Sequence, residues 1–174
     1  MALVVFLKGV NVGGYRRFRP SELAQQLERY DVINVGAAGT LVIRKPVSQS
    51  KIRPELERRL PFEADVMICN GRDILRLTAQ NPFAKERPDR NIVQFVSVLQ
   101  KRPRLTRAVP FNVPTSGEWG LRVLGVQDRF VYGVYRRQMK AIGYLGQLDK
   151  IFGVTATTRS WSTIQSIARL LSDH

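Results

Sequence analysis

The chain has 174 residues, enough for one ordinary domain or two small ones, and its formal net charge of +14 would attract a polyanion. The only histidine is His174 and the only cysteine is Cys69, so Ser-His-Asp and Cys-His catalysis, histidine-rich zinc sites and internal disulfides are excluded. No apolar run approaches the roughly 18 residues that cross a bilayer, and we expect a cytoplasmic protein with no metal, no cofactor and no membrane partner.

The first half of the chain predicts an alternation of strands and helices. Apolar residues at i, i+4 and i+7, as in Leu23, Leu27 and Tyr30, predict a helix, and Pro20 is typical of its first turn. The expected elements are a strand over 3–7, a helix over 20–30, strands over 32–37 and 40–44 around a turn near Gly39, a helix beginning after Ser48 or Ser50, and a strand over 64–69. This is the split βαβ order of a ferredoxin-like plait.

A short helix over 72–80 closes the first half and ends before Pro82, because the residue before a proline is pushed away from helical ψ. The second half then repeats the order of elements. Residues 81–91 are polar, charged and proline-containing, and form the predicted linker. The later elements are expected to be a strand over 92–99, a short helix in the basic stretch 101–107, strands over 119–124 and 129–135, a helix over 139–152, a strand over 154–157 and a helix from Trp161 onward.

We therefore predict an α+β fold of two tandem ferredoxin-like plaits. The N-terminal subdomain covers residues 1–80, and the C-terminal subdomain covers residues 92–174 with the C-terminal helix. Each half alone would bury too little surface to be stable by itself, so we expect the two halves to share an interface.

Two stretches are candidates for anion binding. Three glycines in six residues after the first strand offer positive-φ positions and main-chain N–H groups, although the spacing is that of neither a P-loop nor Gly-x-Gly-x-x-Gly. A turn that only reverses the chain is the alternative there, and helix capping is the alternative at the start of the last helix. The candidates are Lys8, Gly9, Asn11, Gly13, Gly14, Thr158, Arg159, Ser160 and Ser162. We expect the two stretches to face each other across one cleft.

Three basic clusters with aromatic residues nearby suggest nucleic-acid binding. Sheets of the plait type often bind single strands by stacking bases on aromatic rings while Arg and Lys neutralise phosphates. The RNA-recognition consensus of that fold is absent, and we expect most strand aromatics, with Trp119 and Trp161, to pack in the core. The basic candidates are Arg16, Arg17, Arg19, Lys101, Arg102, Arg104, Arg107, Arg136, Arg137 and Lys140.

Three motifs together resemble the domain of unknown function 1697 family of bacterial proteins. They are the opening Leu7-Lys8-Gly9-Val10-Asn11-Val12-Gly13-Gly14, the central Asn81-Pro82-Phe83, and Thr157-Thr158-Arg159-Ser160-Trp161-Ser162-Thr163. The resemblance implies a two-subdomain α+β fold of ferredoxin-like plaits and no established activity. The chain departs from the family's Ser-Gly-Asn at Ala38-Gly39-Thr40, and from its Arg-Asn-Trp-Asn-Thr at Ser160 and Ser162, which would alter any function that those amides carry.

Three functions fit these observations. The first is a nucleic-acid-binding module. The second is a protein or enzyme that takes a small phosphate or carboxylate compound at Lys8, Asn11 and Arg159. The third is an assembly module with an exposed apolar patch around Pro82 and Phe83. No catalytic constellation is recognisable, so the sequence leaves enzymatic activity and oligomeric state open.

Overall fold

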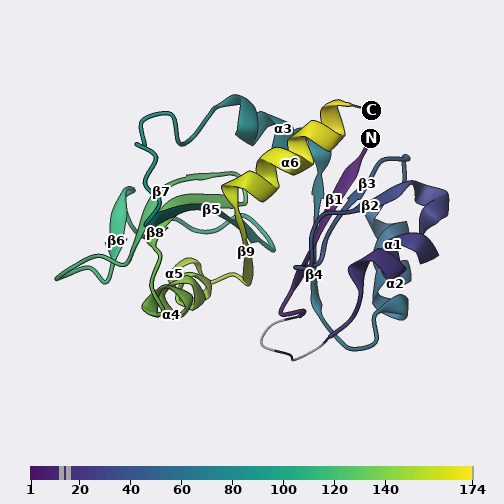
Figure 1. The fold of residues 1–174 in the computed structure, drawn as a ribbon, viewed down its shortest axis with the longest axis horizontal. Coiled ribbons are helices and arrows are strands. Elements are labelled where there is room, and N and C mark those ends of the chain that lie inside the picture. Colours follow the sequence, from purple (N-terminus) through teal and green to yellow (C-terminus); the bar gives the residue numbers. More distant parts are fainter. Residues whose placement is uncertain (12–13, 15–16, 174) are drawn as a thin grey trace. The chain divides into compact units, whose positions relative to one another are not determined.

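The computed structural model describes residues 1–11, 14 and 17–173, and shows an α+β protein with two antiparallel sheets and several helices (Figure 1). The chain divides into two compact units, residues 1–80 with 163–174, and residues 81–162. The last helix, α6 (Trp161–Ser172), thus lies largely with the first unit, whereas the sequence placed it in the second. The reason is close packing, since a Cβ on Gly71 would lie 2.9 Å from Leu171 Cδ2.

The first unit is built on a four-stranded sheet in the order β2-β3-β1-β4. In β1 the residues alternate between faces, and Leu3, Val5 and Leu7 join a buried cluster with residues of α1 and α2. The strands are β1 (Leu3–Lys8), β2 (Val32–Asn34), β3 (Thr40–Ile43) and β4 (Asp65–Asn70); the helices before α6 are α1 (Pro20–Gln26), the 3-10 turn η1 (Glu28–Tyr30), α2 (Gln49–Arg59) and α3 (Gly71–Ala79). Every element expected in this half is present.

A buried carboxylate ties α2 to the end of η1. Glu55 is 8% exposed and accepts a hydrogen bond from Tyr30 Oη at 2.8 Å. Its carboxylate also pairs with Arg29 and with Arg59, the latter at 3.4 Å. The Tyr30 hydroxyl and the Arg29 guanidinium hold the pKa of Glu55 below its ordinary value.

This carboxylate makes stability depend on pH in the acid range. Because the pKa of Glu55 is depressed on folding, its contribution is present above the unfolded value and is lost as pH falls through the lower, folded value. We expect Glu55→Gln to lower Tm by several degrees near neutral pH, since glutamine still accepts from Tyr30 but leaves both guanidinium groups without a charge partner. Thermal unfolding from about pH 7 to about pH 3 should show the two Tm curves converging in acid. Parallel curves would mean that Glu55 does not contribute through its charge.

The second unit contains a five-stranded sheet in the order β6-β7-β8-β5-β9. One of its faces packs on α4 and α5 in a cluster that includes Phe95, Val123, Val131 and Phe152. Its elements are β5 (Ile92–Leu99), β6 (Phe111–Val113), β7 (Leu121–Gln127), β8 (Phe130–Arg136), α4 (Lys140–Gly146), α5 (Leu148–Phe152) and β9 (Ala156–Ser160).

Three sequence expectations fail in this half. Residues 101–107 form no helix, because Pro103 removes a backbone N–H donor and four like charges crowd this short segment. The last strand continues to Ser160 because β9 pairs along β5. Phe83, expected on an exposed patch, is 5% exposed and makes edge-to-face contacts with Tyr132 and Trp161.

No helix in the described part of the chain is long and apolar enough to span a bilayer. Within residues 1–11, 14 and 17–173, no group of three His, Cys, Asp or Glu side chains is arranged to hold a metal ion.

Candidate functional site

The turn after β1 is held together by its asparagine. Gly9, Asn11 and Gly14 have φ values of 73°, 55° and 81°, which is the positive-φ geometry predicted for the two glycines. Asn11 Nδ2 donates to the Ala37 carbonyl at 2.8 Å, and Asn11 Oδ1 accepts from the Phe18 N–H at 2.9 Å. The amide therefore links the turn to both neighbouring loops. Gly13 and Arg16, both predicted site residues, lie outside the described residues, as do Val12, Tyr15 and His174.

Removing this amide should loosen the turn. Asn11→Gly keeps the positive φ but loses two hydrogen bonds, and we expect a loss of about 1–2 kcal/mol in the free energy of unfolding. Asn81→Gly is a matched control, because Asn81 has a φ of 47° and no side-chain hydrogen bond among the described residues. Urea unfolding of both variants checks the difference, and equal losses would assign the effect to the backbone.

The anion candidates before α6 lie on an edge strand. Thr158 Oγ1 is 2.6 Å from Ser97 Oγ on β5, so this hydroxyl is hydrogen-bonded within the sheet. Arg159 is 7% exposed and donates through Nη1 to Thr157 Oγ1 and to the Thr158 carbonyl, both at 2.9 Å. Burial lowers the pKa of Arg159 to about 10, which leaves it protonated at neutral pH.

The two serines at the start of α6 contact each other. Ser160 Oγ and Ser162 Oγ are 3.0 Å apart, which agrees with a local role at the helix start. The shared cleft predicted between these serines and the glycine turn stays a prediction.

The basic residues singled out in the sequence are dispersed. In the first unit, Arg17 and Arg19 line a hollow of about 610 Å³ with Asn11, Gly14 and Phe18. In the second unit, Lys101, Arg102, Arg104 and Arg107 lie on an exposed loop, where Arg102 pairs with Asp128 at 2.9 Å and the Arg107 guanidinium lies 5.2 Å from the Phe111 ring centre. Arg137 and Lys140 are exposed beyond β8. Among the described members of the predicted set, Arg136 alone lies in a cluster with a second arginine and a tryptophan.

That cluster consists of Trp119, Arg122 and Arg136 and lies where β7 begins and β8 ends in the second sheet. Arg122 lies between the core residues Leu121 and Val123, so strand alternation points it away from the core, and Arg136 follows Tyr135 in the same way. The guanidinium carbon of Arg122 is 4.5 Å from the Trp119 ring centre and that of Arg136 is 4.2 Å from it. Both distances are within cation–π range.

Neutral oxygens hold the two guanidinium groups in place. Arg122 Nε donates to Asn112 Oδ1 at 2.8 Å, and Arg136 Nε donates to the Trp119 carbonyl at 2.7 Å. Among the described residues Arg122 has no carboxylate partner, and Arg136 has only Glu118, 3.7 Å away on an 81% exposed side chain. Two positive charges are thus held against the same indole ring with little compensation by carboxylates, an arrangement that favours an anion.

Sequence reasoning missed Arg122 and Asn112 and assigned Trp119 to the core. Trp119 is in fact only half-buried. The available signal was the alternation in Leu121-Arg122-Val123, which places an arginine opposite the core face of a strand. Trp161, by contrast, is 8% exposed and packs as expected.

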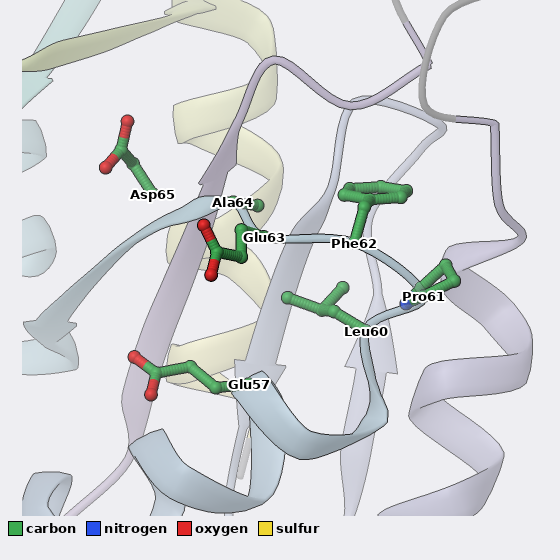
Figure 2. Close-up of a pocket in the computed structure, with 7 residues that line it drawn as sticks. All are labelled: Glu57, Leu60, Pro61, Phe62, Glu63, Ala64 and Asp65. Atoms are coloured by element: carbon green, nitrogen blue, oxygen red, sulfur yellow. The ribbon is translucent and has the colours of Figure 1, made fainter.

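The first unit also has a hollow of about 760 Å³ with the opposite charge. Figure 2 shows the carboxylates of Glu57, Glu63 and Asp65 on one side of it and Phe62 and Pro61 on the other. These three carboxylates would repel a polyanion, so this hollow does not fit the chemistry of the basic cluster.

Fold and cluster together define a basic α+β protein with an arginine–tryptophan cluster on a sheet. The chain belongs to the family described as "Protein of unknown function (DUF1697)", whose model matches residues 1–123, which confirms the resemblance seen in the sequence. The conserved bacterial protein SP0830 from Streptococcus pneumoniae has a similar structure, with a TM-score of 0.63 and 15% identity over 98% of each chain. This likeness concerns the fold alone. No curated protein matches the sequence.

Proposed function

We propose that the second unit binds single-stranded nucleic acid at the Trp119–Arg122–Arg136 cluster. The observation that carries this proposal is the pair of guanidinium groups, anchored through Nε by neutral oxygens and lying over one indole. Phosphates would receive the remaining N–H donors of each fork, and a base would stack on the half-buried ring or on a guanidinium plane. The chain's net charge of +14 would attract such a ligand from a distance.

The sheet topology supports this proposal at the level of the fold. We propose that both units are variants of the ferredoxin-like plait. The order β2-β3-β1-β4 with antiparallel neighbours is the expected one for the first unit. In the second unit β7-β8-β5-β9 repeats it, with β6 added at the edge and a loop in place of the first helix. Plaits of this kind bind single strands on the sheet face opposite their helices. In the second unit this face buries Phe130 and Val134, so the proposed contact is confined to its end, at Arg122 and Arg136.

Binding of a labelled oligouridylate, followed by fluorescence anisotropy at several salt concentrations, tests the function. We expect log affinity to fall linearly with log salt, with a slope of about 0.7 for each phosphate contacted and several phosphates in all. Duplex DNA should bind more weakly, because its bases are not available for stacking. Absence of binding at low salt, or affinity that salt does not change, would contradict the proposal.

A second candidate function is capture of a small phosphate or carboxylate compound at the glycine turn. A Cβ on Gly14 would lie 3.0 Å from an Arg17 Nη atom, so this guanidinium lies against the bare glycine backbone, and Arg19 lines the same hollow. Asn11 uses its amide within the turn, so a ligand would meet main-chain groups and arginines there. A rise in Tm with a nucleotide or a carboxylate metabolite, abolished by Arg17→Ala, supports this function.

A further inference from the structure

The helix α4 and the residue before it, Met139, expose apolar side chains to solvent. Met139 is 92% exposed and Ile142 is 79% exposed, although both belong to classes of residue that are usually buried. On the same side of the helix, a Cβ on Gly143 or Gly146 would meet no atom within 4 Å. Glycine weakens a helix, and no packing inside the protein requires it at these two positions. We call Met139, Ile142, Gly143 and Gly146 the α4 patch.

The α4 patch continues into a shallow hollow. This hollow has a volume of about 320 Å³, and its lining includes Val93 and Tyr135 of the neighbouring strands and Leu145 of the helix. The apolar surface is therefore wider than two side chains, and isolated exposed apolar residues do not account for it.

The charged residues next to the α4 patch in the sequence are all positive. Arg137 and Lys140 flank Met139 and are exposed, and residues 129–148 contain no Asp or Glu. In a symmetric dimer formed through this patch, Arg137 and Lys140 of one copy would lie near the same cations of the other copy, and these like charges would repel. Nucleic acid would satisfy the cations but would leave Met139 and Ile142 uncovered. An anionic lipid surface offers phosphates to the cations and an apolar layer to the protruding side chains.

We propose that the α4 patch docks the protein onto an anionic membrane surface. Met139 and Ile142 enter the boundary between headgroups and acyl chains, while Arg137 and Lys140 bind lipid phosphates. The bare backbone at Gly143 and Gly146 lets the helix lie close to the surface. The sequence predicted no membrane partner because it lacks a spanning segment, but docking at the interface needs none. This inference does not depend on the proposed nucleic-acid function, which uses other residues.

Co-sedimentation with vesicles tests this inference. We expect the protein to bind vesicles of phosphatidylcholine with phosphatidylglycerol and to bind pure phosphatidylcholine vesicles far less. The variant Met139→Ser/Ile142→Ser keeps every charge and should bind the anionic vesicles at least about 10-fold more weakly. Leu75→Ser is the matched control, since Leu75 is an exposed apolar residue on α3 of the first unit, and it should bind as the wild type does.

Several outcomes would overturn the inference. Equal vesicle binding by the double variant would mean that charge alone attracts the protein to lipid. If the wild type does not bind anionic vesicles, the α4 patch is not a membrane-docking surface. A wild-type dimer in sedimentation equilibrium that the double variant loses would make a second copy the occupant. Binding of oligouridylate by the double variant should equal that of the wild type, and a loss there would place nucleic acid on the patch instead.

Discussion

Replacing Arg122 and Arg136 together by alanine should lower the affinity for single-stranded RNA about 30- to 100-fold at low salt. The two guanidinium groups lie 4.5 Å and 4.2 Å from the same indole centre and share no strong carboxylate partner, so both are available to phosphate. Because each phosphate contact to a single strand contributes about 0.7 to the salt dependence, the slope of log affinity against log salt should fall by about 1.4. Anisotropy titrations of both proteins at matched salt concentrations measure both quantities.

The control for the double variant Arg122→Ala/Arg136→Ala removes two positive charges from the first unit. Arg58→Ala/Arg72→Ala takes two exposed arginines from the first unit, and we expect it to lower affinity only through the general field of the protein. A loss as large as that of Arg122→Ala/Arg136→Ala would mean that net charge, and not the cluster, binds RNA. Arg122→Lys/Arg136→Lys keeps the charge without the planar fork, and should retain the salt slope while losing part of the affinity.

Sequence patterns predicted the elements of the first unit because each has a strong local signal. The apolar run of β1, the four-residue spacing of Ile52 and Leu56 in α2, and the prolyl start of α1 all agree with the fold that forms. In the second half the signals are non-local. β9 extends to Ser160 because it pairs with β5, and Phe83 is buried by Tyr132, which lies far from it in sequence.

The candidate site was not predicted because its residues, too, are brought together by non-local strand pairing. Runs of basic residues are the signal that the sequence offers, and such runs lie on exposed loops, where like charges repel and the side chains spread apart. The cluster on the sheet combines Arg122 from β7 with Arg136 from β8, and it adds Trp119 from the loop between β6 and β7. The pairing of β7 with β8 brings these side chains together. Their proximity can be predicted only when the register of these two strands is known.

That register depends on a glycine, and Gly133→Ala should lower the free energy of unfolding of the second unit by about 3 kcal/mol or more. A Cβ on Gly133 would lie 2.2 Å from the Arg122 carbonyl oxygen and 3.0 Å from the Phe95 ring. The carbonyl belongs to the backbone of β7 and cannot rotate away, so the pair of strands must separate. Arg122 would move with β7, and RNA binding should weaken along with stability.

Gly125→Ala is the discriminating control, because it adds the same methyl group to the same strand pair. Its Cβ would lie 2.3 Å from Tyr132 Oη, but this atom is at the free end of a side chain that can turn aside, at the expense of its contact with Phe83. We expect a loss of about 1 kcal/mol there. Both tryptophans of the chain, Trp119 and Trp161, belong to the second unit, so tryptophan fluorescence during urea unfolding follows the loss of that unit's structure. Equal losses in the two variants would show that the backbone of β7 yields as easily as the tyrosine ring does.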